Sequence, residues 1–291
     1  MSLKSFIKKG LSYTLSTLQT KIQVTPQINC ISPNSFLPGR NALITGGTSG
    51  IGYAICKSYV EAGALVVLTG RTQKRVNDTV QRLKDETSSD KIYGLVLDNR
   101  DISSYDRKFQ ELLGILKDKK LDILVNNAGV LGCEFGKGRE EEYSAVMDTN
   151  LKGVFFLSQL VARYMKDNHI AGNILNVASS SSLRPAMSAY TLSKWGIRGL
   201  TLGMARALAP YNIVVNGIAP GPTATPMTMP NGLTNDISLD NNPMGRYALP
   251  EEIASMAVIL VSNICRMVVG DIVYMTGGAG LITFDDMSYN F

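Results

Sequence analysis

Tyr190 and Lys194 stand four residues apart in a segment that we expect to be helical. Residues at positions i and i+4 of a helix share one face and lie about 5–6 Å apart. A phenol alone releases its proton near roughly pH 10, so it is a weak acid at neutral pH. An adjacent ammonium favours the phenolate and brings proton transfer within reach. The pair is therefore a candidate for general acid–base chemistry.

A glycine-rich turn precedes this pair in the chain. Gly46, Gly50 and Gly52 lie between an apolar run and an expected helix. Glycine permits positive φ angles and lets backbone N–H groups approach a phosphate at a helix N-terminus. The spacing Gly-x-x-x-Gly-x-Gly differs from the Gly-x-Gly-x-x-Gly of many dinucleotide-binding folds. The turn nevertheless predicts a loop that holds a pyrophosphate.

The residue after the second apolar run bears on the type of dinucleotide. An NAD site places Asp or Glu there, on the ribose 2′-hydroxyl. This chain has Gly70 followed by Arg71. A guanidinium suits a 2′-phosphate, which a carboxylate would repel. Arg71 therefore predicts NADP(H), with an ordinary surface arginine as the alternative interpretation.

The elements that must position these residues follow from apolar runs and helical periodicity. Strands are expected at 41–45, 64–69, 92–98, 121–126, 173–177, 213–218 and 271–275. Helices are expected from 51, at 73–86, 105–117, 140–166 and 250–261, and around the Tyr190/Lys194 pair to about 209. Apolar strands that alternate with helices are typical of a parallel sheet covered on both faces. We therefore predict an α/β fold, with one doubly wound (Rossmann) domain over residues 37–291 and a seven-stranded parallel sheet.

Composition excludes several classes of function. The net charge of +5 comes from residues 1–60, which hold six basic and no acidic side chains, so nothing indicates a nucleic-acid groove elsewhere. No apolar run approaches the roughly 18–20 residues of a membrane span. The four cysteines lie far apart, which favours reduced thiols in a cytosol-like compartment. With His169 as the one histidine and no cysteine cluster, we expect no metal site.

Residues 1–36 differ from the rest. Their apolar side chains fall at helical spacing from Leu3 to Leu18, with lysines and hydroxyls on other faces. We expect a retained amphipathic arm that packs on a subunit or touches a membrane surface. A cleaved mitochondrial presequence and a disordered tail are the alternatives. Because the charge is all lysine before Arg40, we favour the retained arm and a cytoplasmic protein; a presequence would place it in the mitochondrial matrix.

Taken in order, these landmarks resemble the short-chain dehydrogenase/reductase family, specifically its "classical" type, over about residues 38–280. The motifs that carry the resemblance are Thr45-Gly-x-x-x-Gly-Ile-Gly52, Asn126-Asn-Ala-Gly129, Asn150 in Thr-Asn-Leu-Lys, a serine after the fifth strand, Tyr190-x-x-x-Lys194, and Pro220-Gly221 with Thr225. The resemblance implies NADPH-dependent reduction of a ketone or 3-oxo group to a secondary alcohol. It also implies a homodimer or homotetramer.

The family further implies a role for each site residue. Tyr190 would be the general acid/base, Lys194 would bind the nicotinamide ribose and lower the tyrosine pKa, and Asn150 would hold a water for proton relay. Ser179 is the expected serine. It lies closer to the tyrosine than is usual in the family, so Ser180 and Ser181 stay open. The residues expected to contact the dinucleotide are Gly46, Thr48, Ser49, Gly50, Ile51, Gly52, Arg71, Asp98, Asn99, Asn126, Ala128, Gly129, Tyr190, Lys194, Pro220, Gly221, Thr223 and Thr225.

The substrate is left open between several small carbonyl compounds and alcohols. The 3-oxoacyl-ACP reductases often carry a basic residue before the sixth strand that helps to grip the carrier protein, but this chain has Tyr211 and Asn212 there. A sugar, sugar-nucleotide or secondary-alcohol substrate is the alternative. The loop 222–242 is expected to cover the substrate. A redox-inactive dinucleotide-binding module is a further alternative, and the intact Ser/Tyr/Lys/Asn set argues against it.

Overall fold

The computed structural model describes residues 36–116, 118–229 and 236–283. The expected N-terminal arm lies outside these residues except for its last position, Phe36. Seven parallel strands form one sheet in the order β3-β2-β1-β4-β5-β6-β7, which confirms the predicted fold. The strands are β1 (Asn41–Ile44), β2 (Leu65–Gly70), β3 (Ile92–Val96), β4 (Ile123–Asn126), β5 (Asn173–Val177), β6 (Val214–Pro220) and β7 (Ile272–Met275).

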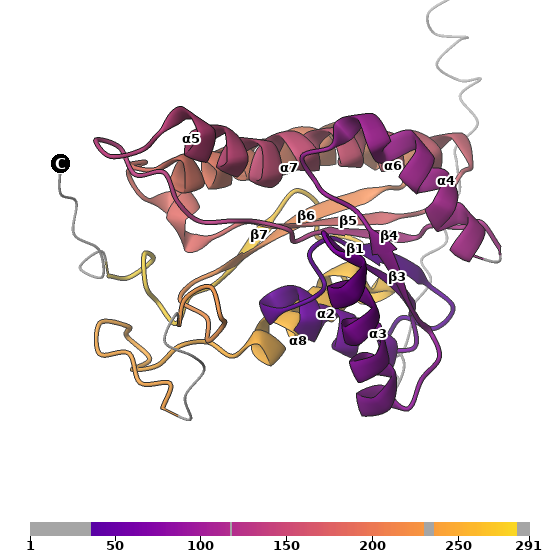
Figure 1. The fold of residues 1–291 in the computed structure, drawn as a ribbon, viewed down its shortest axis with the longest axis horizontal. Helices are drawn as coiled ribbons and strands as arrows, with labels where there is room; N and C mark the ends of the chain where they lie inside the picture. Colours follow the sequence, from indigo (N-terminus) through magenta and orange to yellow (C-terminus); the bar gives the residue numbers. More distant parts are fainter. Residues whose placement is uncertain (1–35, 117, 230–235, 284–291) are drawn as a thin grey trace, which may run out of the picture. The chain divides into compact units, whose positions relative to one another are not determined.

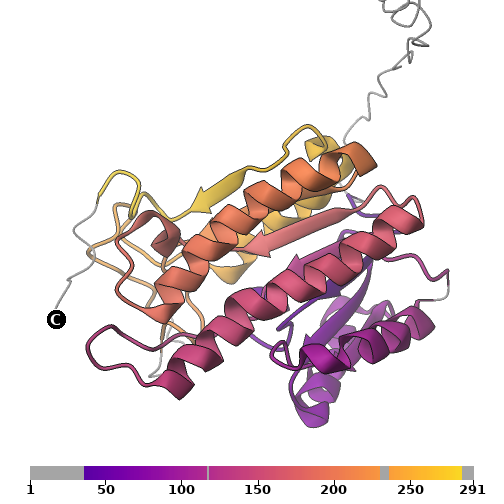
Figure 2. The ribbon, with the colours of Figure 1, turned by 90° about the horizontal axis from the view of Figure 1, so that it is seen from above.

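Helices cover both faces of this sheet (Figure 1). One face carries α2 (Gly50–Glu61), α3 (Gln73–Thr87) and α8 (Pro250–Val261). The other carries α4 (Tyr105–Ile115), α5 (Glu140–Met147), α6 (Gly153–Asp167) and α7 (Ala189–Leu208). Seen from above, α6 and α7 lie side by side across the sheet (Figure 2). Among the described residues, no helix is long and apolar enough to cross a membrane.

The two layers of helices explain why the strands read as continuous apolar runs. Every residue of β1, β4, β5 and β6 is buried, as a parallel sheet between two helical layers requires. One core contains Ile55 and Tyr59 of α2 with Ile253 of α8. The other contains Phe109 of α4 and Leu157 of α6. Burial on both faces fixes the strand ends, from which the site residues project.

One predicted element has a different internal geometry. The helix expected at 140–166 consists of α5, a π-helical segment Asp148–Lys152, and α6. A π segment inserts one extra residue per turn and often marks a functional site. It cannot be read from apolar periodicity, because it changes the period over a single turn. Asn150 lies at its centre.

The strand order places a crevice at the middle of the sheet. β1 pairs with β2 on one side and with β4 on the other, so the connections leave β1 and β4 in opposite directions. Doubly wound sheets bind ligands at such a switch point, outside the carboxyl ends of the strands. The glycine-rich turn follows β1, and the segment 127–129 follows β4. Both therefore meet at this crevice.

Candidate active site

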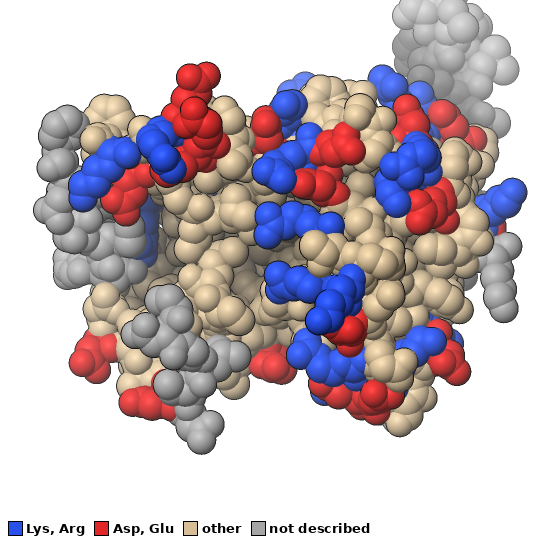
Figure 3. All heavy atoms as spheres, viewed as in Figure 1, with Lys and Arg blue, Asp and Glu red and all other residues tan. Residues whose placement is uncertain are grey.

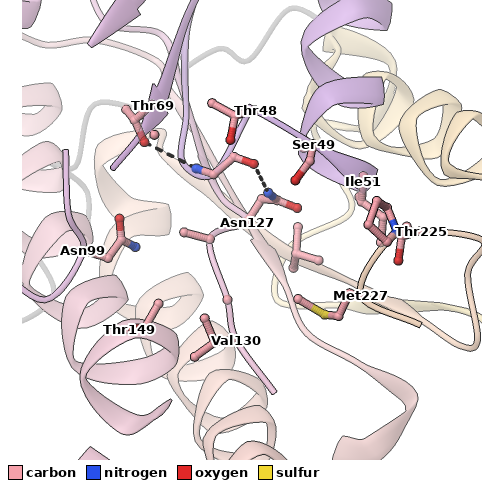
Figure 4. Close-up of a pocket in the computed structure, with 18 of the residues that line it drawn as sticks. Thr48, Ser49, Ile51, Thr69, Asn99, Asn127, Val130, Thr149, Thr225 and Met227 are labelled. Carbon is pink, nitrogen blue, oxygen red and sulfur yellow. Dashed lines mark hydrogen bonds between the residues drawn. The ribbon is translucent and has the colours of Figure 1, made fainter. Parts of the chain in front are cut away.

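A cavity of about 550 Å³ opens at these carboxyl ends (Figure 4). Its walls include the turn after β1, the end of β2, the segments after β3 and β4, the end of β5, α7, and the loop after β6. Every predicted site residue lines it except Asn126 and Asn150. The topology thus brings residues as distant in sequence as Gly46 and Thr225 to one cavity.

The turn after β1 lines the cavity with backbone at its glycines and with the side chains of Thr48 and Ser49. Gly46 has a φ of +65° and Gly50 a φ of +55°. Residues other than glycine rarely adopt positive φ angles. A Cβ at Gly46 would also lie 2.8 Å from the Cα of Ala128. The Gly46 N–H donates to Thr69 Oγ1 at 3.3 Å. The turn leads directly into α2, whose N-terminal N–H groups are suited to a phosphate.

Asn126, the last residue of β4, and the adjacent Asn127 make different contacts. Asn126 does not line the cavity; it is buried and donates to Ser158 Oγ and Asn176 Oδ1, both at 2.8 Å. Asn127, which was not among the predicted site residues, lines the cavity. Its amide donates to the carbonyl of Gly46 at 3.1 Å (Figure 4). Asn126 therefore braces the sheet, whereas Asn127 holds the glycine-rich turn.

The opposite wall of the cavity carries polar and charged groups suited to an adenosine. Arg71 at the end of β2 and Asn99 after β3 both line it. The Asn99 amide points into the cavity in Figure 4, and its buried Nδ2 has no hydrogen-bond partner among the described residues. A buried donor without a partner costs free energy, so this atom is suited to a ligand acceptor.

Ser179 and Tyr190 both line the cavity. Ser179 follows β5, and Tyr190 lies in the first turn of α7, where Ser188 caps the helix by accepting from Thr191 N. Burial raises the pKa of Tyr190, and a hydrogen bond with the Ser179 hydroxyl acts in the opposite direction. Of the three candidate serines, Ser179 is the one among the cavity-lining residues; Ser180 and Ser181 are not.

Lys194 lies beside this pair. Its ammonium is 5.6 Å from the centroid of the Tyr190 ring and donates to the carbonyl of Val177 at 2.8 Å. The residue is 5% exposed, and burial lowers the pKa of its ammonium to about 8. A group with that pKa remains mostly protonated at neutral pH, so it can supply a positive charge to its surroundings.

Asn150 does not line the cavity and contacts the residues around this cluster through hydrogen bonds. Its Oδ1 accepts from Val130 N at 2.8 Å, and its Nδ2 donates to Val130 O at 2.9 Å and to Ser193 Oγ at 3.2 Å. Ser193 in turn donates to the backbone carbonyl of Tyr190. The side chain therefore links the segment after β4 to the first turns of α7. Its expected role in holding a water stays a prediction.

The loop after β6 closes the remaining side. Pro220, Gly221, Thr223 and Thr225 line the cavity, and Met227 joins them. Met227 carries its sulfur towards the cavity (Figure 4). Part of the expected covering loop, residues 230–235, lies outside the described residues.

Several further lining residues were not predicted. They are Asn127, Val130, Thr149, Thr72, Arg75, Arg100, Val177, Ala178, Met227 and others that neighbour predicted positions. Most lie within two residues of a motif, so a wider window around each motif would have included them. Arg75 could have been found from its position one helical turn after Arg71. Within the described ranges, no group of three or more His, Cys, Asp or Glu side chains could hold a metal ion.

The residues present fit a nicotinamide dinucleotide. The cavity combines a glycine-rich turn, a buried amide donor with no hydrogen-bond partner in the described part of the chain, and basic side chains at one end. Its other end holds the Ser179, Tyr190 and Lys194 cluster. These features suit the adenosine, the pyrophosphate and the reacting ring of one dinucleotide, with the pyrophosphate between the other two.

Comparison with known proteins gives the family. The sequence matches the short chain dehydrogenase family over residues 40–236. The 3alpha-hydroxysteroid dehydrogenase of Mediterraneibacter gnavus is 35% identical over 251 residues, which cover 84% of this chain and 98% of that protein.

Two solved structures are similar over nearly their whole lengths. A gluconate 5-dehydrogenase from Burkholderia cenocepacia J2315, in complex with NADP and tartrate, has a TM-score of 0.74 and 32% identity, covering 83% of this chain and 95% of that one. A 3-ketoacyl-(acyl-carrier-protein) reductase from Brucella melitensis, complexed with NADH, has a TM-score of 0.75 and 28% identity, covering 84% of this chain and 100% of that one. The chain belongs to the short-chain dehydrogenase/reductase family of oxidoreductases.

Proposed function

We propose that this protein is an NADPH-dependent reductase that converts a ketone or 3-oxo group to a secondary alcohol. The observation that carries the proposal is the cluster of Ser179, Tyr190 and Lys194. The Ser179 side chain opposes the rise that burial causes in the pKa of the Tyr190 phenol, and the ammonium of Lys194 lies 5.6 Å from the Tyr190 ring. All three side chains line one cavity with the glycine-rich turn.

The bound nicotinamide would supply the hydride that adds to the carbonyl carbon. Tyr190 would donate its phenolic proton to the carbonyl oxygen, which Ser179 would hold by a hydrogen bond. Lys194 would stabilise the phenolate that remains, because its positive charge lies beside the ring. Such positioning orders the reacting groups before the transfer. Asn150 would keep the first turns of α7 in place through Ser193.

The preference for NADP(H) rests on Arg71. It lines the cavity at the end of β2, where an acidic residue would select NAD. Its guanidinium has no hydrogen bond or ion pair to another described side chain, so it is available to a phosphate. The similar structures named above contain NADP in one case and NADH in the other. The proposed preference for NADP(H) therefore depends on this chain's own Arg71.

The substrate that we propose first is a 3-oxoacyl group, with a sugar or another secondary alcohol as the alternative. The similar proteins are named for acyl-carrier, gluconate and steroid substrates. Arg266 donates to the carbonyl and the side chain of Asn212, at 2.6 Å each. A basic side chain thus lies beside Asn212, just before β6, although Arg266 itself belongs to the segment between α8 and β7. This arginine supports a contact with an acidic carrier protein.

We also propose a homodimer or homotetramer in a reducing, cytosol-like compartment. Exposed apolar side chains on α6 and α7, among them Phe155 and Leu202, support self-association. Cys56, Cys133 and Cys265 are free thiols, which supports a reducing compartment.

The proposal is tested by incubating purified full-length protein with NADPH and three ketones: a 3-oxoacyl thioester, a ketosteroid and a keto-sugar acid. We expect NADPH oxidation with at least one of them and an alcohol product of matching amount. If the protein binds NADPH but oxidises it with none of the ketones in a broad panel, the result would contradict a reductase. It would support a redox-inactive dinucleotide-binding module.

A further inference from the structure

Asp98 and Arg100 form an ion pair at the adenosine end of the cavity. The Arg100 side chain donates through Nε to both carboxylate oxygens, at 3.1 and 3.2 Å, and through Nη2 to Oδ2 at 2.7 Å. The Arg100 backbone N–H adds a further hydrogen bond to Oδ1 at 3.0 Å. One arginine therefore occupies both oxygens of this carboxylate, and its planar group fixes the direction in which the carboxylate points.

Two other arginines share this end of the cavity. Arg71 follows β2, and Arg75 lies in the first turn of α3; both line the cavity with Asp98 and Arg100. Neither guanidinium has a hydrogen bond or ion pair with another described residue. Figure 3 shows basic side chains grouped on this face, between α3 and the upper helical layer. Three arginines and one aspartate leave two positive charges, which match the roughly −1.5 to −2 charge of a phosphate monoester.

Asp98 is a competitor for those free arginines. The hydrogen bonds from Arg100 are the main reason that the pKa of Asp98 is lowered, and the positive charge of Arg71 contributes as well. The carboxylate therefore lies within electrostatic reach of Arg71. Without Arg100 it would carry an unpaired charge that attracts Arg71 and repels a phosphate.

We infer that Arg100 is a positioning residue for cofactor choice: by holding Asp98, it leaves Arg71 and Arg75 available to the 2′-phosphate of NADP(H). The inference rests on the proposed NADP(H) preference and extends it. Arg100 acts through the carboxylate and makes no contact with the phosphate. Selection for the phosphate then depends on three positions, 71, 75 and 100, of which only the first follows directly from the strand-end motif.

The test measures binding of NADP⁺ and NAD⁺ to the full-length protein by calorimetry, and takes the ratio of the two dissociation constants. These ligands differ only in the 2′-phosphate, so effects on the shared adenosine cancel in the ratio. Arg100→Gln should reduce the preference for NADP⁺ by about fivefold, the size expected of one partly exposed charge. Asp98→Asn alone should leave the preference unchanged or raise it. The double variant Asp98→Asn/Arg100→Gln should recover the wild-type ratio, because no carboxylate remains to be held.

Each outcome has a distinct meaning. If Arg100→Gln lowers the ratio and the double variant does not recover it, Arg100 contacts the phosphate itself and the inference is wrong. An unchanged ratio in Arg100→Gln also overturns the inference. If the wild-type protein binds NADP⁺ no more tightly than NAD⁺, the proposed cofactor preference fails instead. Circular dichroism and thermal unfolding of each variant identify any that has failed to fold, and Arg100→Lys then replaces Arg100→Gln, since a lysine cannot form the same bidentate pair.

Discussion

The ammonium of Lys194 donates a 2.8 Å hydrogen bond to the backbone carbonyl of Val177, the last residue of β5. This bond joins α7 to the strand that precedes Ser179. It therefore fixes the tyrosine and the serine relative to each other as well as the lysine. The same burial that makes this contact possible lowers the pKa of the ammonium to about 8.

Lys194 should make the stability of the ligand-free protein depend on pH. Its folded pKa of about 8 lies below the value of about 10.4 for an unperturbed lysine, so the unfolded state binds more protons between these values. The free energy of unfolding contributed by this group therefore rises with pH across that window, by about 3 kcal/mol. In Lys194→Met this contribution should be absent.

Urea denaturation of the wild-type protein and Lys194→Met at pH 7 and about pH 10 measures this difference. Lys166→Met, at an exposed position, is the matched control and should follow the wild type. Parallel pH dependences for the wild type and Lys194→Met would show that Lys194 is not buried as described.

Replacing Arg71 by Ala should weaken NADP⁺ binding by about 1–3 kcal/mol and change NAD⁺ binding little, because a charge-assisted contact to the 2′-phosphate is lost. Calorimetry with both ligands measures the two losses. Arg82→Ala is the control on α3: Arg82 lies over the Tyr53 ring and outside the cavity lining. Equal losses for NADP⁺ and NAD⁺ would refute the assignment of Arg71.

Substitution of Asn126 should lower the stability of the protein, whereas substitution of Asn127 should weaken cofactor binding. Asn126→Ala removes two buried hydrogen bonds and should lower the free energy of unfolding by about 1–3 kcal/mol. The folded fraction should still bind NADP⁺ with nearly unchanged affinity. Asn127→Ala releases the glycine-rich turn and should weaken NADP⁺ binding. Denaturation curves and calorimetry on both variants decide this, and the reverse pattern would contradict the roles given above.

Light scattering at micromolar concentration should give the mass of a dimer or tetramer. Leu202 is 52% exposed on α7, and it lies outside the cavity lining. Leu202→Glu should lower the mass, because a charge buried in an interface without a partner is costly. A monomeric wild-type protein would disprove the proposed association.

The sequence was sufficient for the fold because buried parallel strands carry a strong and simple signal. All seven strands lie where apolar runs predicted them, with ends shifted by a few residues. At the sixth strand, predicted at 213–218 and observed as Val214–Pro220, the observed end continues into Pro220 because the strand pairs with β7 up to Met275. That pairing is a tertiary contact and has no local sequence signal.

The site was predicted less completely, for physical reasons that differ between residues. Asn126 and Asn127 are identical in type, and only the alternation of a strand end decides which of them faces the cavity. The π segment around Asn150 depends on packing against Val130 and Ser193. The role of Arg100 depends on a pairing with Asp98 that a motif does not encode. The N-terminal arm, whether retained or cleaved, stays a prediction because it lies outside the described residues.

The central claim is that Tyr190 donates the proton in ketone reduction. Tyr190→Phe keeps the ring and its packing and removes the phenolic proton. Single-turnover measurement of NADPH oxidation with a ketone that the wild-type protein reduces, alongside calorimetry for the cofactor, tests the claim most directly. The account predicts an unchanged dissociation constant for NADPH and a rate lower by at least about 10²–10⁴-fold. A Tyr190→Phe protein that reduces the ketone at nearly the wild-type rate would contradict it.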